Sequence, residues 1–339
     1  MKFLKDDEFI ILMAHNDKRT QDRGDTYHVH TLEERVRMRQ AGIQTAHEQP
    51  AWNAIEPSRG SYDFGYLDNI INLNRQAGMK SLIQIAGWRI PNWIPDSWRP
   101  WDQNGNVHKD ILSLWNEEAQ QYADNFYDLL IDKYQSYDDV QFFHGEYQGG
   151  EGAYPPDWCF FDPEALIDFK MLFGSDAIPE PNHPDTLEWY GSKVIEHFVR
   201  RAEPFYKAYG EVYNAQQFLM DTWTKGFGNF VQDKILNVFR TLWPKTNIVL
   251  MQYTYFDPTH KEDNAQFVKK LMDETKCEVI AEALFADGLR WTTGAAISKG
   301  FRGQILHPTI GSFSGGGLTD EIVGIIKNSH EEWMRSRNL

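Results

Sequence analysis

The sequence has few cysteines and no long apolar run. Cys159 and Cys277 are the only cysteines in 339 residues, which is too few for a disulfide framework or for a zinc site built from cysteines. The apolar run from Phe9 to Ala14 is too short for the core of a signal peptide or for a membrane-spanning helix. We therefore expect a soluble protein that is cytoplasmic, or secreted with its leader already removed.

Basic residues are also scarce. The 34 Lys and Arg residues stand against 49 Asp and Glu residues, and the formal net charge is −15. No block of basic residues interrupts this acidic excess. Electrostatic repulsion therefore disfavours nucleic acid and anionic membranes as partners and leaves a neutral or cationic substrate.

Motifs for phosphate and metal binding are missing as well. No Gly-x-Gly-x-x-Gly follows a strand pattern and opens a helix, and there is no phosphate-binding P-loop. The segment Gly311 to Gly317 is glycine-rich, but its spacing fits a flexible loop better than a phosphate cradle. His28 and His30 have a spacing that metal ligands use, yet they lie in a polar segment that favours a plain loop. We predict no metal site and no cofactor.

Eight short apolar segments rich in Ile, Val and Phe predict strands that are buried on both faces. Helical patterns lie between most of them, and this alternation is typical of a parallel sheet. Eight units favour a closed (β/α)8 TIM barrel over an open sheet, and no repeat or linker divides residues 1–339 into more than one domain. The predicted strands are Phe9–Ala14, Ile43–Glu48, Lys80–Ala86, Val140–Glu146, Ala215–Asp221, Asn247–Tyr253, Glu278–Ala283 and Gly303–His307.

The first predicted helix begins with a capping box formed by Thr31 and Glu34 and ends near Gly42. Long connections follow three of the strands, and in a barrel they would form long loops at the C-terminal face, where functional loops belong. These connections are Asp17–His30, Trp88–Trp115 and Tyr147–Pro184. The other predicted helices are Leu67–Ala77, Asn116–Tyr134, Asp185–Tyr209, Asn229–Leu242, Asn264–Glu274 and Thr319–Arg335.

Two glutamates near strand ends are the strongest catalytic candidates. Glu146 ends the strand pattern that starts at Val140 and precedes a glycine-rich segment, and Glu282 lies within an otherwise apolar strand pattern. A charge in an apolar strand costs several kcal/mol unless it is paired or functional. Glycoside hydrolysis with retained stereochemistry needs two carboxylates, and a barrel brings remote strand ends to one rim. Glu278 would lie at the opposite end of its strand, where a role in stability is expected.

The chain is rich in aromatic residues, which make up 14% of it, and many of its tryptophans fall in predicted loops. Aromatic faces stack on the apolar faces of sugar rings, while polar tips bond sugar hydroxyls. Any single tryptophan could instead anchor a loop, but their number favours a sugar-binding cleft. The candidate stacking platforms are Trp88, Trp93, Trp223 and Trp291. The polar candidates for sugar binding are His15, Asn16, His47, Glu48, Arg89, His144, Gln148 and Glu151.

A stretch earlier in the chain resembles the second and third strand region of clan A glycoside hydrolases. It reads Trp52-Asn-Ala-Ile-Glu56-Pro57-Ser-Arg-Gly60-Ser-Tyr62-Asp63-Phe64, then Leu67-Asp68 and Pro91-Asn-Trp93. The similarity is greatest to the family 42 β-galactosidases, with families 35, 39 and 5 behind them. In physical terms the loop turns at Pro57 and Gly60 and anchors its aromatic residues before a helix.

The resemblance implies a retaining double displacement, with an acid/base glutamate after strand four and a nucleophile glutamate at strand seven. By strand count these roles fall on Glu146 and Glu282. The resemblance also implies a tyrosine beside the nucleophile at the end of strand six, which would be Tyr253 or Tyr255, with Tyr253 preferred. The expected partner is an oligosaccharide or polysaccharide, either a β-galactoside or, with less support, a bacterial polysaccharide.

The chain departs from the family pattern at one position. The acid/base in this clan usually follows an asparagine that bonds the sugar 2-hydroxyl, whereas Gly145 precedes Glu146 here. We expect His144, Gln148, His47 or Glu48 to take over that contact. The alternatives to a retaining enzyme are a catalytically inactive sugar-binding barrel, an inverting glycosidase that uses Glu151, and an isomerase or lyase on the same barrel. The last would need a metal cluster or a lysine base at strand ends.

Overall fold

The chain folds into a closed barrel of eight parallel strands in the order β1 to β8. The computed structural model describes residues 3, 9–13, 31–85, 90–109, 111–144, 160–175, 177–178, 183–215, 248–253, 269, 272–273, 278–284, 297, 300, 302–307 and 319–337. The strands are β1 (Phe9–Met13), β2 (Ile43–Glu48), β3 (Lys80–Gln84), β4 (Val140–His144), β5 (Val212–Ala215), β6 (Ile248–Tyr253), β7 (Glu278–Leu284) and β8 (Gly303–His307). The predicted (β/α)8 barrel is confirmed.

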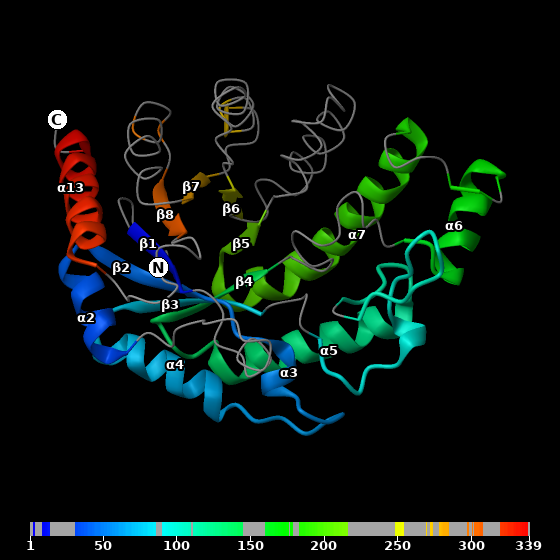
Figure 1. The fold of residues 1–339 in the computed structure, drawn as a ribbon, viewed down its shortest axis with the longest axis horizontal. Coiled ribbons are helices and arrows are strands. Elements are labelled where there is room, and N and C mark those ends of the chain that lie inside the picture. Colours follow the sequence, from blue (N-terminus) through cyan, green and yellow to red (C-terminus); the bar gives the residue numbers. More distant parts are fainter. Residues whose placement is uncertain are drawn as a thin grey trace.

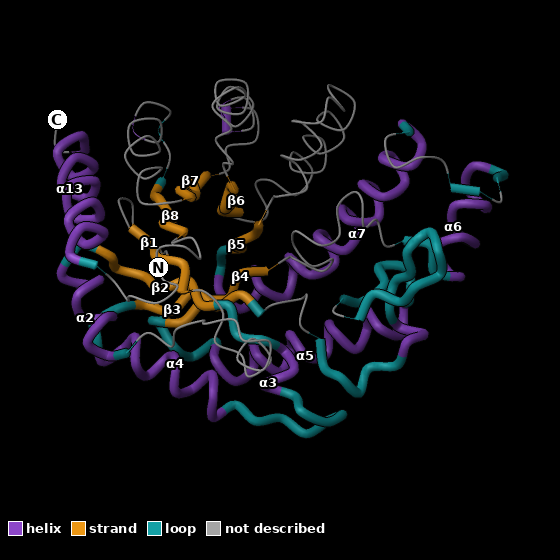
Figure 2. The backbone as a smooth tube through the Cα atoms, viewed as in Figure 1, coloured by secondary structure: helices purple, strands orange, loops and turns teal. Residues whose placement is uncertain are grey.

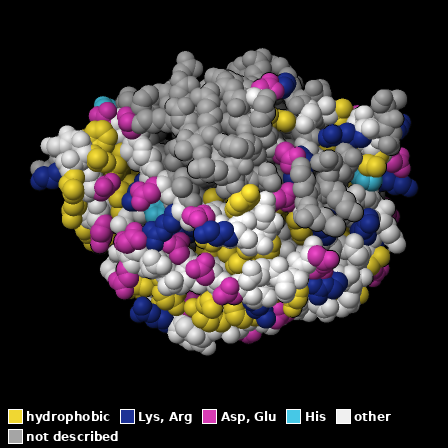
Figure 3. All heavy atoms as spheres, turned by 180° about the vertical axis from the view of Figure 1, so that it is seen from behind, with side chains coloured by type: hydrophobic (Ala, Val, Ile, Leu, Met, Phe, Trp, Pro, Cys, Tyr) yellow, Lys and Arg dark blue, Asp and Glu magenta, His cyan; other side chains and the backbone are white. Residues whose placement is uncertain are grey.

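The described helices surround the strands, as Figures 1 and 2 show for α13, α2, α4, α5 and α7. They are α2 (Leu32–Gln40), α3 (Trp52–Ile55), α4 (Gly65–Gln76), the short 3-10 helix η1 (Asp96–Trp98), α5 (Glu117–Tyr134), α6 (Pro163–Phe173), α7 (Pro184–Tyr209) and α13 (Asp320–Arg337). None of the helices in the described part of the chain is both long and apolar enough to cross a membrane. Acidic and basic side chains are interspersed over the described part of the face in Figure 3.

Local sequence signals explain several helix boundaries. Helix α2 starts with the predicted capping box, in which Glu34 N donates to Thr31 Oγ1 at 3.3 Å and Thr31 N donates to Glu34 Oε2 at 2.8 Å. Asn116 caps α5 by accepting from Ala119 N at 2.8 Å. Both starts were predicted correctly because the capping residues precede an apolar helical pattern.

Two predictions about the elements need correction. The fifth strand begins at Val212, three residues before its predicted start at Ala215, because Val212 and Tyr213 are the fully buried residues that follow the turn at Gly210. The segment 147–184 was read as a loop, but it contains α6. Asp162 caps α6 and Pro163 occupies its first turn. The predicted helix Asn229–Leu242 lies outside the described residues, as does most of Asn264–Glu274.

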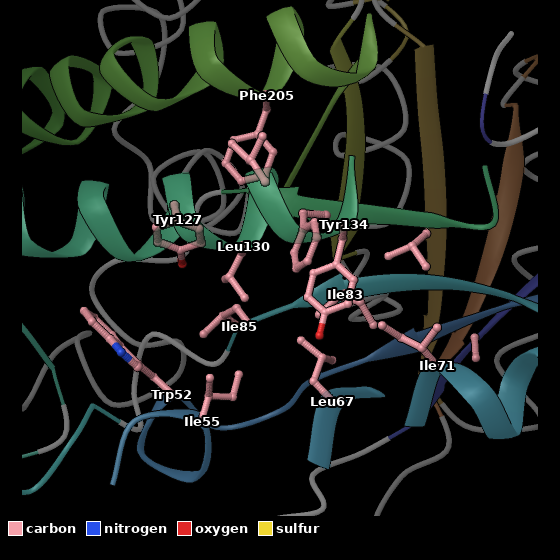
Figure 4. Packing of buried hydrophobic residues seen from close by; sticks show 14 of the residues in the cluster. Trp52, Ile55, Leu67, Ile71, Ile83, Ile85, Tyr127, Leu130, Tyr134 and Phe205 are labelled. Atoms are coloured by element: carbon pink, nitrogen blue, oxygen red, sulfur yellow. The ribbon is translucent and has the colours of Figure 1, made fainter. Parts of the chain in front are cut away.

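The main hydrophobic core lies between the barrel wall and the helix layer. Figure 4 shows Ile83 and Ile85 of the β3 region packing toward Leu130 and Tyr134 of α5, with Leu67 of α4 nearby. The ring of Trp52 stacks on Phe126 with 4.5 Å between centroids. Such burial of apolar surface provides most of the folding free energy.

The turn at Gly42, between α2 and β2, packs closely against the C-terminal helix α13. Its φ is 112°, and a Cβ atom there would lie 2.5 Å from Cγ of His330 on α13. Only glycine fits both the backbone conformation and the close approach. Gln44 Nε2 lies 3.2 Å from Nε2 of the same histidine, so the turn before β2 is held against the C-terminal helix.

Polar side chains close the amino-terminal end of the barrel. The Phe3 backbone N and the Tyr213 hydroxyl each donate to Glu211 Oε2 at 2.9 Å, and the rings of Phe3 and Tyr213 meet edge-on. Arg302 Nη1 lies 2.5 Å from Glu278 Oε2. Glu278 is therefore at the end predicted for it, paired with a cation that stabilises the barrel.

Candidate functional site

The carboxyl ends of all eight strands face the same rim of the barrel, because every neighbouring pair is parallel. This is the end at which (β/α)8 enzymes place their reacting groups. Tyr253 ends β6 and pairs in register with Glu282 of β7. The tyrosine implied by the resemblance thus occupies the backbone position next to the candidate nucleophile.

Several predicted site residues lie outside the described residues, and their roles stay predictions. They are His15, Asn16, Trp88, Arg89, Glu146, Gln148, Glu151, Trp223, Tyr255 and Trp291. The backbone places His144 at the last position of β4, two residues before Glu146.

His47 and Glu48 are neighbours at the end of β2, but they face opposite sides of the barrel wall. Gln44 contacts α13 and Glu48 bonds α2 and α4, so these alternate residues face the helix layer. Thr45 and His47 therefore face the barrel interior, where His47 is 1% exposed. Of the two, His47 lies on the side from which a substrate would be bound.

Glu48 is part of a buried network between β2 and the helices. Its carboxylate pairs with Arg35 of α2 and accepts a hydrogen bond from Asn74 Nδ2 of α4 at 2.9 Å. Asn74 also donates to Ser81 Oγ of β3 at 3.0 Å. We therefore correct the prediction that Glu48 bonds a sugar hydroxyl, because its carboxylate joins the barrel wall to the helices.

The Trp52 to Phe64 motif and Tyr122 of α5 form a hydrogen-bonded cluster around the side chain of Glu56, which is fully buried. Glu56 Oε2 accepts from Trp52 Nε1 at 2.8 Å, and Oε1 accepts from Gly60 N at 2.8 Å and from the Tyr122 hydroxyl of α5. Burial and the bond to this carboxylate raise the pKa of Tyr122. The motif thus fixes the loop after β2 against α5.

Trp93, a predicted stacking platform, contacts the same cluster around Glu56. Its Nε1 donates to the Glu56 carbonyl oxygen at 3.3 Å, and its ring meets Tyr122 edge-on with 5.1 Å between centroids. The Arg59 guanidinium lies 5.8 Å from the Trp93 ring centroid. The ring is only partly buried, so its role in stacking stays a prediction.

A second hydrophobic core joins the long segments after β3 and β4. It contains Trp115, Phe160, Phe169 and Trp189 together with Leu114, Ala165 and Tyr190. The Trp115 and Trp189 indoles both donate to Asp168 Oδ2, at 3.0 and 2.7 Å. His197 Nε2 of α7 lies 2.8 Å from the Leu114 carbonyl oxygen, and burial lowers the pKa of His197 to about 3. This second core therefore holds the segment that follows β3 against the segment that follows β4.

Asp162 lies at the joint between these segments and was not identified from the sequence. Its Oδ1 accepts from Ser113 Oγ at 3.1 Å and from Ala165 N at 3.3 Å. Its Oδ2 is buried without a hydrogen-bond partner among the described residues. Burial raises the pKa of Asp162 to about 6. An aspartate three residues before an alanine gives no sequence signal beyond that of a helix cap.

The Asp162→Asn variant is expected to be more stable than the wild type at neutral pH. The folded-state pKa is above the usual value, so wild-type stability falls as pH rises from about 4 to about 6 and then levels off. Asparagine keeps the cap without the buried charge, and a gain of about 1 to 2 kcal/mol at pH 7.5 is expected, vanishing near pH 4. Urea unfolding at both pH values measures it.

Asp102→Asn serves as the control. Hydrogen bonds from Asn106 and Asn104 lower the pKa of Asp102, so its variant should lose stability at neutral pH where Asp162→Asn gains it. A gain of equal size for Asp162→Asn at pH 4 and pH 7.5 would show that charge burial is not its cause.

Comparison with known proteins agrees with the sequence resemblance. Residues 25–149 match the family model of glycoside hydrolase family 42, described as β-galactosidase. β-Galactosidase BgaH of Haloferax lucentense is 37% identical over 60 residues, which are 17% of this chain and 9% of that protein. The predicted resemblance to family 42 is thus confirmed for this part of the sequence.

Solved structures show the same fold at low identity. The catalytic domain of β-amylase from Paenibacillus polymyxa has a TM-score of 0.71 and 13% identity, covering 97% of this chain and 99% of that one. β-Galactosidase from Marinomonas ef1 has a TM-score of 0.66 and 13% identity, covering 98% of this chain. The match spans 60% of that galactosidase and 9% of the curated relative.

Proposed function

We propose that this chain is a glycoside hydrolase that cleaves a β-glycosidic bond with retention of configuration, with a β-galactoside as the first substrate class to test. The register of Glu282 beside Tyr253 at the carboxyl end of β7 and β6 carries the proposal. It is supported by the family 42 match over residues 25–149 and by the barrel, which places strand ends at one rim.

Each glutamate has a defined role in the proposed reaction. Glu282 attacks the anomeric carbon while Glu146 donates a proton to the leaving oxygen, which yields a covalent glycosyl-enzyme intermediate. Glu146 then takes a proton from water, which attacks the anomeric carbon and releases Glu282. This assignment requires the two carboxyl groups to be roughly 5 to 5.5 Å apart, whereas inversion would need roughly 6.5 to 9.5 Å.

The sugar 2-hydroxyl needs a partner other than the usual asparagine, because Gly145 brings no side chain. Among the candidates in the described part of the chain, His47 faces the barrel interior and Glu48 faces the helices. We propose that His47, His144 or Gln148 makes this contact. Equal hydrolysis rates for 2-deoxy and 2-hydroxy forms of the substrate would contradict such a contact.

Proton NMR of the first product formed from an aryl β-galactoside tests the mechanism. Retention predicts that the β-anomer appears first and then mutarotates, because two inversions at one carbon restore its configuration. An α-anomer as first product, together with loss of activity in Glu151→Gln and not in Glu146→Gln, would support the inverting alternative. A panel of aryl β-glycosides and polysaccharides with no turnover would support the inactive sugar-binding barrel.

The Glu146→Gln variant is expected to discriminate between leaving groups. With an alkyl or disaccharide leaving group, loss of the proton donor should lower kcat/KM by about 10² to 10⁴-fold. With a dinitrophenyl leaving group, which departs without a proton, kcat/KM should change far less while kcat still falls. Steady-state kinetics on both substrates measures the difference, and an equal loss on both would remove Glu146 from the acid role.

A further inference from the structure

Helix α6 has apolar side chains on its outer face as well as on the face that packs against the protein. On the inner side, Ala165 and Phe169 are buried in the second hydrophobic core. On the outer side, Ile167 is 60% exposed and Met171 is 80% exposed. A helix that is apolar all round is normally buried on all sides, whereas the outer side of α6 is open to solvent. The large apolar side chains of this outer face are Leu166, Ile167, Met171, Leu172 and Phe173.

The inner side of α6 holds the helix, and therefore its outer face, in a fixed position. The Asp168 carboxylate accepts hydrogen bonds from the indoles of Trp115 and Trp189 at 3.0 and 2.7 Å. At the end of the helix, the ring of Phe173 stacks on the buried ring of Phe169 with 4.7 Å between centroids. A surface that is ordered before it makes contact loses little conformational entropy on binding. The outer face of α6 is thus preorganised for contact with another folded surface.

The outer face of α6 is large enough for a stable contact between two proteins. Figure 1 shows α6 at the right-hand edge of the molecule, beyond α7 and away from the strands. Its exposed apolar side chains present roughly 400 Å² of apolar surface, a size that marks interaction sites on proteins. Apolar atoms contribute about 57 to 65% of a dimer interface, so two such faces correspond to a contact of roughly 1,300 Å² in total. This area lies within the range of specific, stable interfaces.

The charges on the outer face of α6 favour a second copy of this chain as its partner. Each chain has a formal net charge of −15, so two copies repel each other unless they meet where the local charge is low. The outer face of α6 meets this condition, because the exposed Glu164 and Lys170 have opposite charges. They lie three residues before and three residues after Ile167, and with about 3.6 residues per turn they flank it on opposite sides. When two copies of α6 pack antiparallel about a two-fold axis at Ile167, Glu164 of each copy is level with Lys170 of the other.

We propose that α6 is the contact helix of a symmetric dimer, in which the outer faces of α6 from two copies of this chain pack antiparallel. A two-fold contact uses the same surface on both subunits, and an apolar stripe flanked by one acidic and one basic residue is complementary to its own antiparallel copy. Ile167 and Met171 form the buried centre of this contact, and Glu164 and Lys170 lie at its polar rim. The α6 sequence is apolar all round because the protein covers one side of the helix and the second copy covers the other.

Sedimentation velocity over a series of micromolar concentrations tests the proposal, and the wild type should sediment as a dimer. Ile167→Glu should raise the dimer dissociation constant about 100-fold or more, because a carboxylate replaces an apolar side chain at the centre of the contact. Met171→Glu should have the same effect and replaces Ile167→Glu if that variant does not fold. Leu129→Glu is the matched control, since it makes the same change at an exposed position of α5 and should leave the dissociation constant unchanged. A monomeric wild type, or an assembly that Ile167→Glu leaves intact, overturns the proposal.

Charge-reversal variants test the antiparallel orientation and the identity of the partner. Glu164→Lys leaves only basic residues at the rim of the contact, and Lys170→Glu leaves only acidic ones. Each variant alone should dimerise about tenfold more weakly than the wild type at low salt. An equimolar mixture of the two variants should dimerise as the wild type does, because acidic and basic residues then meet again across the contact. A mixture that dimerises no better than either variant alone overturns the proposal. Neither measurement involves hydrolysis, so the outcome is independent of the proposed function.

Discussion

Replacing Glu282 with glycine is expected to lower kcat/KM for a β-galactoside by about 10⁴-fold or more, because the step that forms the covalent intermediate loses its nucleophile. The fold should persist, since the change is confined to one position near the rim end of β7. Thermal unfolding monitored by circular dichroism establishes that the variant is folded before its kinetics are measured.

The reaction with azide shows which catalytic role each glycine variant has lost. In Glu282→Gly the azide ion can occupy the vacated space and attack the anomeric carbon of an aryl β-galactoside once, which gives an α-galactosyl azide by a single inversion. In Glu146→Gly the azide attacks after Glu282 has reacted, and the product keeps the β configuration. NMR of the two azides therefore assigns both roles. Identical configurations from the two variants would contradict the assignment.

Glu278→Gln is a control on the same strand. Glu278 lies at the amino-terminal end of β7 and pairs with Arg302, far from the rim. Its variant is expected to unfold at a lower temperature and to keep its kcat/KM. Loss of catalysis in both variants would indicate that substitutions in β7 disturb the barrel itself, in which case the azide products decide the role of Glu282.

The Arg35→Met variant is expected to lose about 3 to 5 kcal/mol of unfolding free energy, because it leaves the Glu48 carboxylate buried without its cation. The side chains of Arg35 and Glu48 are 0% and 2% exposed, so solvent cannot replace the lost partner. Urea unfolding at pH 7 measures the loss. If the role of Glu48 is structural, the kcat/KM of the remaining folded protein should stay near that of the wild type.

Two further variants test this interpretation. Arg35→Met combined with Glu48→Leu removes both charges and should recover most of the lost stability, since apolar replacements of buried pairs are often neutral. Arg37→Met, on the same helix, removes an exposed pair with Asp320, whose side chain is fully exposed, and should cost under about 1 kcal/mol. Equal losses in Arg35→Met and Arg37→Met would show that burial of the pair is not what matters.

The predictions from sequence succeeded where the signal is local. The capping box at Thr31, the Asn116 cap and the strands Ile43–Glu48 and Gly303–His307 all have the predicted residues. Each depends on side chains within a few residues of one another, which a single sequence displays directly. The start of the fifth strand was predicted three residues too late, because Glu211 and Asn214 flank Val212 and Tyr213 and interrupt the apolar pattern there.

The sequence did not predict in the same way whether a strand side chain points into the barrel or toward the helices. A barrel strand is buried on both faces, so its sequence does not alternate between apolar and polar residues. His47 and Glu48 were therefore assigned one role, although the structure places them on opposite sides of the wall. The hydrogen bond from Gln49 Nε2 to Gln84 Oε1 was not predicted either, because a glutamine at the end of a strand or just after it has no special meaning until its neighbours are known.

The sequence by itself determined the class of fold, the order of the strands and the pair of candidate carboxylates, because these depend on periodicity, residue type and a motif of contiguous residues. Only the tertiary structure decided which side chains meet. Glu48 bonds Arg35, 13 residues away, Gln84 bonds Gln49, 35 residues away, and Tyr122 bonds Glu56, 66 residues away. These contacts form between elements that come together only when the barrel closes and its helices pack against it.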